Sequence, residues 1–227
     1  MAERFRGSSE IPLTDEGVRG VRDLATRLAA KGGLHEIQTS DLGRTVHTSR
    51  IISQYTHAPI TYQGTGLHPW HLGSLEGQEI TPETLRYHQH LIKDAPDEIP
   101  QGRGPLSTAD GESFNQFKAR TLPMIQKLIS QSATSPTRRI GVTTHYRVKK
   151  LLDAWLQGGS DPDGAIDTEE MIRHGASNTP GSVDRLVMDP YAGPQMFDVD
   201  LKSPTPLGGG LYFLRHEATA WNAPEGS

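Results

Sequence analysis

The chain has 227 residues, enough for one large domain with a substantial buried core. Its 23 Lys and Arg against 27 Asp and Glu give a formal net charge of −4, which argues against a broad cationic surface for nucleic acid. It has no cysteine, which excludes disulfides, thiolate metal sites and a cysteine nucleophile. No run approaches the roughly 18 apolar residues of a membrane span, and the first ten residues lack the apolar stretch of a secretory signal. We expect a cytoplasmic protein with no nucleic-acid and no membrane partner.

Helix and strand signals alternate along the first part of the chain. Thr14 suits a helix N-cap, and Asp15 and Glu16 suit the positive end of a helix dipole. Apolar residues then recur at three- and four-residue spacing as far as the Gly32-Gly33 pair. Further elements are expected in chain order: a strand over 36–40, an amphipathic helix over 44–54 and a β-prone stretch over 60–63.

The same alternation returns after an irregular segment. Residues 64–115 are rich in Gly, Pro and His, which favours an elaborated loop or cap with one helical piece over 82–93. Helices are then expected over 113–131 and 146–157, turns over 158–168, and strands over 139–144, 182–188, 196–201 and 211–214. Strands separated by helices predict an α/β fold, a three-layer sandwich whose mostly parallel central sheet is flanked by helices. No repeat or linker divides the chain, so we expect a single domain over 1–227 with a cap or insertion at about 64–115.

Three of the expected strands end in side chains that suit an anion. The last strand runs into Arg215 and His216, an earlier one ends at His145, and the first leads through a short loop to Arg44 at the start of a helix. Because ligands bind beyond the carboxyl ends of parallel strands, these groups should meet at one edge of the sheet. Guanidinium forks and helix N-termini both match phosphate oxygens. Each residue alone has a structural or surface interpretation, but their coincidence predicts a phosphate pocket with a histidine nucleophile.

The segments around these residues resemble those of the histidine phosphatase, or phosphoglycerate mutase-like, superfamily. The family's RHG signature is similar to LYFLRHEATAWN (211–222), and the segment that normally follows it is similar to RFRGSSEIPLTDEG (4–17). The strand, loop and helix that carry its second arginine resemble IQTSDLGRTVHTS (37–49), and its second-histidine segment resembles GVTTHYRVKKLL (141–152). The family's L-x-E-x-x-x-G-x-x-E-G segment resembles LHPWHLGSLEG (67–77), and its GES element resembles GESF (111–114). These matches span most of the chain.

The order of the motifs differs from that of the family. The signature belongs at the N-terminus, whereas here it closes the chain. Joining the tail WNAPEGS to the head MAERFRGSS restores the family's run, so the sequence resembles a circular permutant with its new ends in the loop after Asn222. The two termini must then be close in space, as exposed loop sites commonly allow. The Pro- and Gly-rich segment 203–210 would be the new connection.

The resemblance implies a role for each matching residue. His216 would become phosphohistidine, Arg215 and Arg44 would grip the phosphoryl oxygens, His145 would be the second pocket histidine, and Asn222 and Thr219 would add donors. Covalent catalysis of this kind splits one displacement into two, with water as the second acceptor. Fixed positive charge stabilises the transition state, so neither metal nor cofactor is implied. The resemblance implies a metal-independent phosphatase that acts on a small-molecule phosphate ester or a phosphorylated substrate. A homodimer is a possible oligomeric state.

Two positions depart from the family pattern. The Gly of the RHG signature is Glu217 here, a carboxylate that could orient His216 or repel anions. In a gapless alignment, Pro69 stands where the family often has its general-acid glutamate, and proline cannot donate a proton. Glu76 and His68 are the nearest substitutes, and Glu76 also fits a structural role. The identity of the general acid is left open.

Other functions also fit the sequence. Within the family, a phosphoglycerate mutase-type phosphotransferase is the alternative, although nothing in 64–115 indicates phosphoglycerate recognition. A catalytically weak member that acts as a binding or structural protein is suggested by Pro69 and Glu217.

A metallohydrolase built on histidines is the remaining alternative. His68 and His71 lie in a Gly- and Pro-rich loop without an HExxH pattern, and His88 and His90 fall on the helical piece. Because helix residues two apart do not face each other, we expect His88 and His90 in solvent. We expect no metal site.

Overall fold

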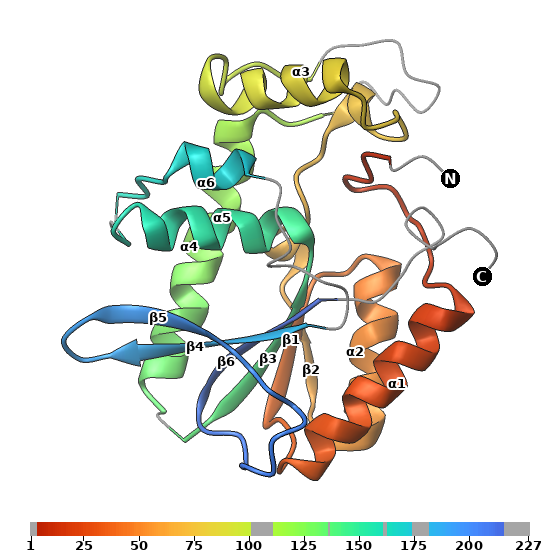
Figure 1. The fold of residues 1–227 in the computed structure, drawn as a ribbon, viewed down its shortest axis with the longest axis vertical. Coiled ribbons are helices and arrows are strands. Elements are labelled where there is room, and N and C mark those ends of the chain that lie inside the picture. The colour runs from red at the N-terminus through yellow and green to blue at the C-terminus, as the bar shows by residue number, and fades with distance from the viewer. Residues whose placement is uncertain (1–3, 101–110, 136, 161–162, 174–181, 216–227) are drawn as a thin grey trace.

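The computed structural model of the chain describes residues 4–100, 111–135, 137–160, 163–173 and 182–215. Four candidate site residues lie outside these ranges: His216, Glu217, Thr219 and Asn222. For Arg215 only the backbone is described. Figure 1 shows a central twisted sheet with helices packed on both of its faces.

Helices and strands alternate along most of the described chain. The α-helices are α1 (Asp15–Ala30), α2 (Gly43–Thr56), α3 (Pro82–Lys93), α4 (Phe114–Ala133), α5 (Tyr146–Gln157) and α6 (Thr168–Ile172). The strands are β1 (Glu36–Thr39), β2 (Ile60–Tyr62), β3 (Arg139–Thr144), β4 (Val183–Asp189), β5 (Gly193–Asp198) and β6 (Gly210–Arg215). Two 3₁₀ turns, Gly64–Leu67 and Gly73–Leu75, precede α3. None of the helices in these ranges combines the length and apolar content needed to cross a lipid bilayer.

The sheet is mixed, with strand order β2-β1-β3-β6-β4-β5. The first four strands in this order are parallel, as the alternation of helices and strands predicts. The other two are not, because β4 runs antiparallel to β6 and β5 returns antiparallel to β4 as a hairpin. The expectation of a mostly parallel sheet therefore describes the four strands that lead to the candidate site but not β4 and β5.

Side-chain caps fix where the main helices begin. The Thr14 hydroxyl accepts a hydrogen bond from the Gly17 amide at 3.0 Å, as expected for the N-cap of α1. Ser113 and Gln116 form a reciprocal capping box at the start of α4. Thr81 caps α3 in a similar way, with Pro82 in the first turn. Polar residues of the loops thus set the ends of the helices that cover the sheet.

The sheet separates two hydrophobic clusters. Alternate residues of β6 point to opposite faces, with Leu211 and Phe213 in one cluster and Tyr212 and Leu214 in the other. The first cluster lies under α4 and α5 and the second under α1 and α2. Residues from the 64–115 segment, among them Leu67, Trp70, Leu91 and Ile92, join the first cluster, so its described parts pack on the main core.

The structure differs from the local expectations in three places. The strand expected over 196–201 is β5 at Gly193–Asp198, because a tight turn after Asp189 closes the β4–β5 hairpin earlier. Helix α6 directly follows the 158–168 turns and was not expected, although the Asp167 side chain caps it through two amides. His88 is 1% exposed and stacks on Phe5 and Trp70, with ring centroids 5.4 and 5.1 Å away. The expectation that His88 lies in solvent was wrong, because α3 packs His88 against the N-terminal segment. The side chain of His90 is partly exposed.

Candidate functional site

Three strand ends meet at one edge of the sheet, as the sequence predicts. Thr143 of β3 is paired with Thr39 of β1, and Thr144 is paired with Arg215 of β6. His145 follows β3 directly and is the N-cap residue of α5. This register brings His145 next to the loop that leads from β1 into α2.

Arg44, in the first turn of α2, lies at the centre of this edge. It is 2% exposed, which excludes the alternative of a surface helix residue. Its guanidinium donates from Nη1 to the Ser9 carbonyl at 2.7 Å, from Nη2 to the Gly7 carbonyl at 3.0 Å and from Nε to Nδ1 of His145 at 3.3 Å. Burial, with a smaller contribution from the charge of Arg6, lowers the pKa of Arg44 to about 10. The group therefore remains a cation at neutral pH.

The contacts of His145 select one tautomer. A guanidinium can only donate, so Nδ1 of His145 is the acceptor of the Arg44 bond and the ring proton is on Nε2. Nε2 lies 2.8 Å from Oγ of Ser40, and Oγ of Ser40 lies 2.6 Å from the Thr45 hydroxyl, which donates to the Leu42 carbonyl at 2.9 Å. A chain of hydrogen bonds thus orients the imidazole, which is 3% exposed.

Glu76 holds the N-terminal segment against Arg44. Its carboxylate is 5% exposed and accepts from the Ser8 amide, from the Ser8 and Ser9 hydroxyls and from the Leu72 amide, at 2.6–3.1 Å. Gly7 has φ +48°, and a Cβ there would lie 2.1 Å from Oε1 of Glu76. These contacts give Glu76 a structural role, which the sequence analysis offered as the alternative to a general acid.

His68 has a different neighbour. Its Nε2 is hydrogen-bonded to Oδ1 of Asp41, in the loop between β1 and α2, and this bond lowers the pKa of Asp41. The imidazole is about one-fifth exposed, so it lies at the rim of the site and not in its interior. In the part of the chain that the structure describes, no three His, Asp or Glu side chains gather as metal ligands would.

The N-terminus of α2 is partly occupied. The amide of Gly43 donates to both carboxylate oxygens of Glu10, at 3.2 and 3.0 Å. The amide at this helix start is therefore already bound to a carboxylate, and its contribution to a phosphate pocket stays a prediction.

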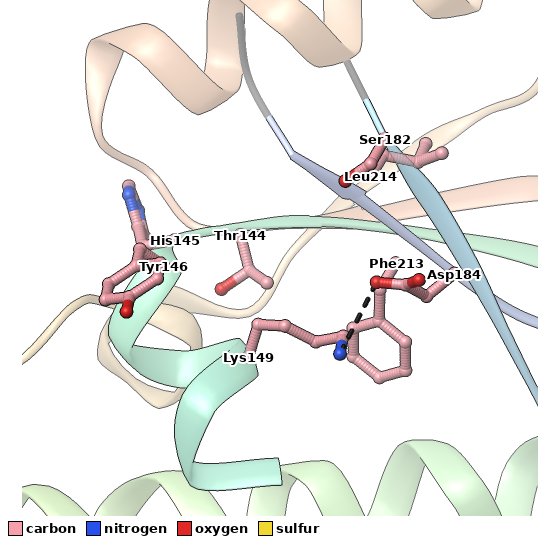
Figure 2. Close-up of a pocket in the computed structure, with 8 residues that line it drawn as sticks. All are labelled: Thr144, His145, Tyr146, Lys149, Ser182, Asp184, Phe213 and Leu214. Atoms are coloured by element: carbon pink, nitrogen blue, oxygen red, sulfur yellow. Dashed lines mark ion pairs between the residues drawn. The ribbon is translucent and has the colours of Figure 1, made fainter. Parts of the chain in front are cut away.

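A small cavity extends from His145 between the start of α5, the end of β6 and the start of β4 (Figure 2). The imidazole of His145 points away from Lys149 and Asp184, which form an ion pair of 3.4 Å on the other side of the cavity. Burial raises the pKa of Asp184 to about 6, with the nearby carboxyl of Asp198 adding to the shift and Lys149 opposing it. No sequence pattern indicates this cluster, because Asp184 and Asp198 become neighbours only through the β4–β5 hairpin.

Arg147, two residues after His145, is a further buried cation that was not among the candidate residues. It is 9% exposed, and burial lowers its pKa to about 10. The signal that could have identified it is its position in the first turn of a helix whose N-cap is a candidate site histidine.

Comparison with known proteins gives one family match and several partial relatives. The family model described as "Histidine phosphatase superfamily (branch 1)" matches residues 1–168. Proteins named Probable phosphoglycerate mutase are similar: that of Proteus mirabilis is 35% identical over 114 residues, 48% of this chain and 52% of the relative, and that of Escherichia coli K12 is 32% identical over 124 residues, 53% and 57%. This chain therefore spans about half the length of the curated relatives it matches.

Two solved structures share the fold. The α-ribazole phosphatase of Shigella flexneri superposes with a TM-score of 0.61 at 20% identity, over 90% of this chain and 91% of that one. A mycobacterial glucosyl-3-phosphoglycerate phosphatase in complex with inorganic phosphate also gives a TM-score of 0.61, at 18% identity and over 88% and 91% of the two chains.

Proposed function

The chain belongs to the histidine phosphatase superfamily, and from this premise we propose that it hydrolyses phosphate monoesters through a phosphohistidine intermediate on His216, without metal or cofactor. The observation that carries the proposal is the contact between Arg44 and His145 at the sheet edge. Both are residues that the family motifs match, and they come from different strand ends. Buried guanidinium next to a neutral imidazole is an environment that suits a bound phosphoryl group.

The proposed reaction has two displacements. In the first, a ring nitrogen of His216 attacks phosphorus and the bond from phosphorus to the leaving oxygen breaks. In the second, water attacks phosphorus and the nitrogen–phosphorus bond breaks, which releases inorganic phosphate and restores His216. Arg44 and Arg215 hold the phosphoryl oxygens. The Nε2–H of His145 exchanges its hydrogen bond to Ser40 for one to a phosphoryl oxygen. Thr219 and Asn222 add donors, and Glu217 orients His216.

His68 is our proposed proton donor to the leaving oxygen. Its Nε2 is hydrogen-bonded to the carboxylate of Asp41, which holds the imidazole at the rim of the site. Glu76 is the weaker candidate, because both of its oxygens already accept hydrogen bonds from the segment around Ser8 and Ser9. His68 gives its proton to the leaving group in the first step and recovers one from water in the second.

We also propose that the chain is circularly permuted relative to its family. In support, Arg44 binds the carbonyls of Gly7 and Ser9 and also touches His145, which adjoins the strand pair Thr144–Arg215. The segment that begins the chain is therefore next to the strand that would carry the signature. A reordered gene that starts at Gly208 and joins Ser227 to Met1 should give a folded protein with the same activity. An unfolded product would contradict the permutation.

Phosphoglycerate mutase-type phosphotransfer is the second candidate, since the curated relatives carry that name. In that reaction, a substrate hydroxyl takes the place of water as the second acceptor. Incubation with phosphoglycerate separates the two, because a mutase moves the phosphoryl group between hydroxyls and a phosphatase releases inorganic phosphate. The small-molecule substrate, the cytoplasmic location and a homodimer stay predictions.

Hydrolysis of an aryl phosphate in excess EDTA tests the proposal. We expect turnover that persists with EDTA and is lost in His216→Ala, whose folding is checked by circular dichroism. Activity that EDTA abolishes and zinc restores would instead favour a metallohydrolase. A folded protein with no turnover and no affinity for vanadate or phosphate would favour a binding role.

A further inference from the structure

The segment that carries His68 has no regular structure of its own. Residues 68–72 belong to neither a helix nor a strand, so contacts with other elements must set the direction of the imidazole. Arg120, on α4, supplies three such contacts. Its guanidinium donates from Nη1 to the carbonyls of Thr65 and His68, the second at 3.2 Å, and from Nη2 to the carbonyl of Pro69 at 2.7 Å. One side chain therefore holds the backbone at His68 and on both sides of it.

Glu112 fixes the guanidinium of Arg120 in this position. Nε donates to one carboxylate oxygen of Glu112 at 2.8 Å and Nη2 donates to the other at 2.5 Å, the bidentate geometry that arginine forms with a carboxylate. The pair is largely shielded from water, since the side chains of Arg120 and Glu112 are 23% and 16% exposed. Glu112 also reaches the segment itself, because its carboxylate accepts from the amide of His71 at 2.9 Å and its carbonyl accepts from the indole of Trp70 at 2.8 Å. Both members of the ion pair are therefore bound to the segment 65–71.

The contacts of Arg120 engage it with the protein and leave it no direct role with a substrate. Every nitrogen of its guanidinium already donates to a protein oxygen. What the guanidinium controls is the direction of His68, whose Nε2 meets Asp41 at the rim of the site. The hydroxyl of Thr144 adds a tie from the end of β3, because it donates to the carbonyl of Leu67 at 3.0 Å. The segment is thus fastened to both α4 and the sheet edge.

We propose that Arg120, paired with Glu112, is a positioning residue that holds His68 in place for proton transfer to the leaving oxygen. This inference rests on the proposed function and adds a residue to its first step. Proton transfer needs the donor within hydrogen-bond reach of the acceptor, and a displacement of about 1 Å can cost about a hundredfold in rate. Without Arg120, the carbonyls of Thr65, His68 and Pro69 lose the donor that they share, and the imidazole turns away from the leaving group.

The dependence on the leaving group separates positioning of the acid from damage to the whole site. Arg120→Met keeps an unbranched side chain and removes all of its donors. We expect kcat/KM for an alkyl phosphate to fall by about tenfold or more, while kcat/KM for dinitrophenyl phosphate and the affinity for vanadate stay within about twofold. Dinitrophenolate departs without a proton, so its release does not need His68. Arg120→Lys retains a cation without the planar fork and should recover only part of the loss.

A double-mutant cycle shows whether Arg120 acts through His68. In a His68→Asn background, Arg120→Met should lower the alkyl phosphate rate by less than about twofold, because the group that it positions is already absent. Arg139→Met is the matched control. Arg139 also binds loop carbonyls, those of Gly33 at 2.6 Å and Gly32 at 2.7 Å, but at the opposite end of β3. Its substitution should leave the ratio of the alkyl to the dinitrophenyl phosphate rate unchanged.

Glu112→Gln provides a milder variant in case Arg120→Met does not fold, which circular dichroism detects. The amide has the shape of the carboxylate but lacks its charge and one acceptor oxygen, so the pair with Arg120 is weakened. We expect a smaller loss of alkyl phosphate turnover with the same dependence on the leaving group.

The outcomes distinguish this inference from the proposed function. Equal losses for the two esters, a loss that adds in full to that of His68→Asn, or an unchanged alkyl phosphate rate in folded Arg120→Met would overturn the positioning role and leave the proposed function standing. The same holds for a wild-type protein that hydrolyses only dinitrophenyl phosphate, since it has no working acid. If the wild-type protein hydrolyses neither ester and binds no vanadate, the proposed function fails and the positioning role fails with it.

Discussion

Arg44 donates from Nε to Nδ1 of His145 across 3.3 Å, which joins the start of α2 to the start of α5. The two residues are 101 positions apart in the sequence, and the parallel pairing of β1 with β3 makes them neighbours. One bond thus fixes both the orientation of a buried cation and the tautomer of the imidazole beside it. The electrostatics of the site depend on this pair.

Arg44→Lys tests the fork of the guanidinium separately from its charge. Lysine retains a cation but cannot bind Gly7, Ser9 and His145 together, so we expect kcat/KM for an aryl phosphate to fall by about a hundredfold. Arg50→Lys, on the exposed side of the same helix, is the matched control and should have normal activity. A folded Arg44→Lys protein with full activity would contradict the assignment.

Ser40→Ala removes the hydrogen bond to Nε2 of His145. The imidazole loses its orientation, and we expect kcat/KM to fall by about five- to twentyfold, the worth of one buried hydrogen bond. Ser49→Ala is the control, because its hydroxyl is buried on α2 without a hydrogen-bond partner among the described residues. Equal effects of the two substitutions would show that the loss comes from packing and not from His145.

The proton donor can be identified because the rate loss on its removal should depend on how much the leaving group needs a proton. His68→Asn should lower kcat/KM for an alkyl phosphate by about a hundredfold. Dinitrophenyl phosphate needs no protonation on departure, so its rate should be unchanged. His90→Asn is the matched control, since His90 forms a similar histidine–aspartate pair with Asp94 away from the site. If Glu76→Gln gives this pattern and His68→Asn does not, the acid is Glu76.

Asp184 makes stability depend on pH. Its pKa is raised to about 6 in the folded protein, so the folded state holds this proton more tightly than the unfolded chain. The stabilisation present at low pH is lost as the pH rises from about 4 to about 6. Charges of Lys149, Asp153, Glu170 and Asp198 face the same groove.

Asp184→Asn should therefore raise the free energy of unfolding by about 1 kcal/mol at about pH 7.5, a value that includes a reduction for screening by solvent in the groove. At about pH 4 the substitution should change the free energy of unfolding little. Urea denaturation at the two pH values measures the difference. Asp189→Asn on the same strand is the control: turn amides lower the pKa of Asp189, so its substitution should give no gain at neutral pH. If Asp184→Asn raised the free energy of unfolding equally at both pH values, the raised pKa of Asp184 would be contradicted.

Much of the parallel part of the fold could be predicted from periodicity and caps. Thr14 marks the start of α1, and the strand ends at Ser40 and His145 predict the edge where Arg44 lies. These predictions hold because the signals are local and parallel strands end on the same side of a sheet. The roles of His216 and its neighbours stay predictions.

The misses have a common physical cause in contacts between distant segments. His88 is buried by Phe5 and Trp70, and no pattern within α3 indicates those partners. Lys150 is 2% exposed and pairs with Glu170 at 2.5 Å, although lysine is rarely buried. That pair exists because α6, a helix of five residues, folds back over α5.

The most direct measurement is the chemical trapping of the enzyme during turnover. Brief exposure to a ³²P-labelled phosphate ester, followed by alkaline quenching and peptide mapping, locates any covalently bound phosphoryl group. We predict a label on His216 that is stable in base and lost in acid, and that is absent in His216→Ala. A protein that turns over substrate without such a label, or that retains its activity in His216→Ala, would contradict the phosphohistidine mechanism.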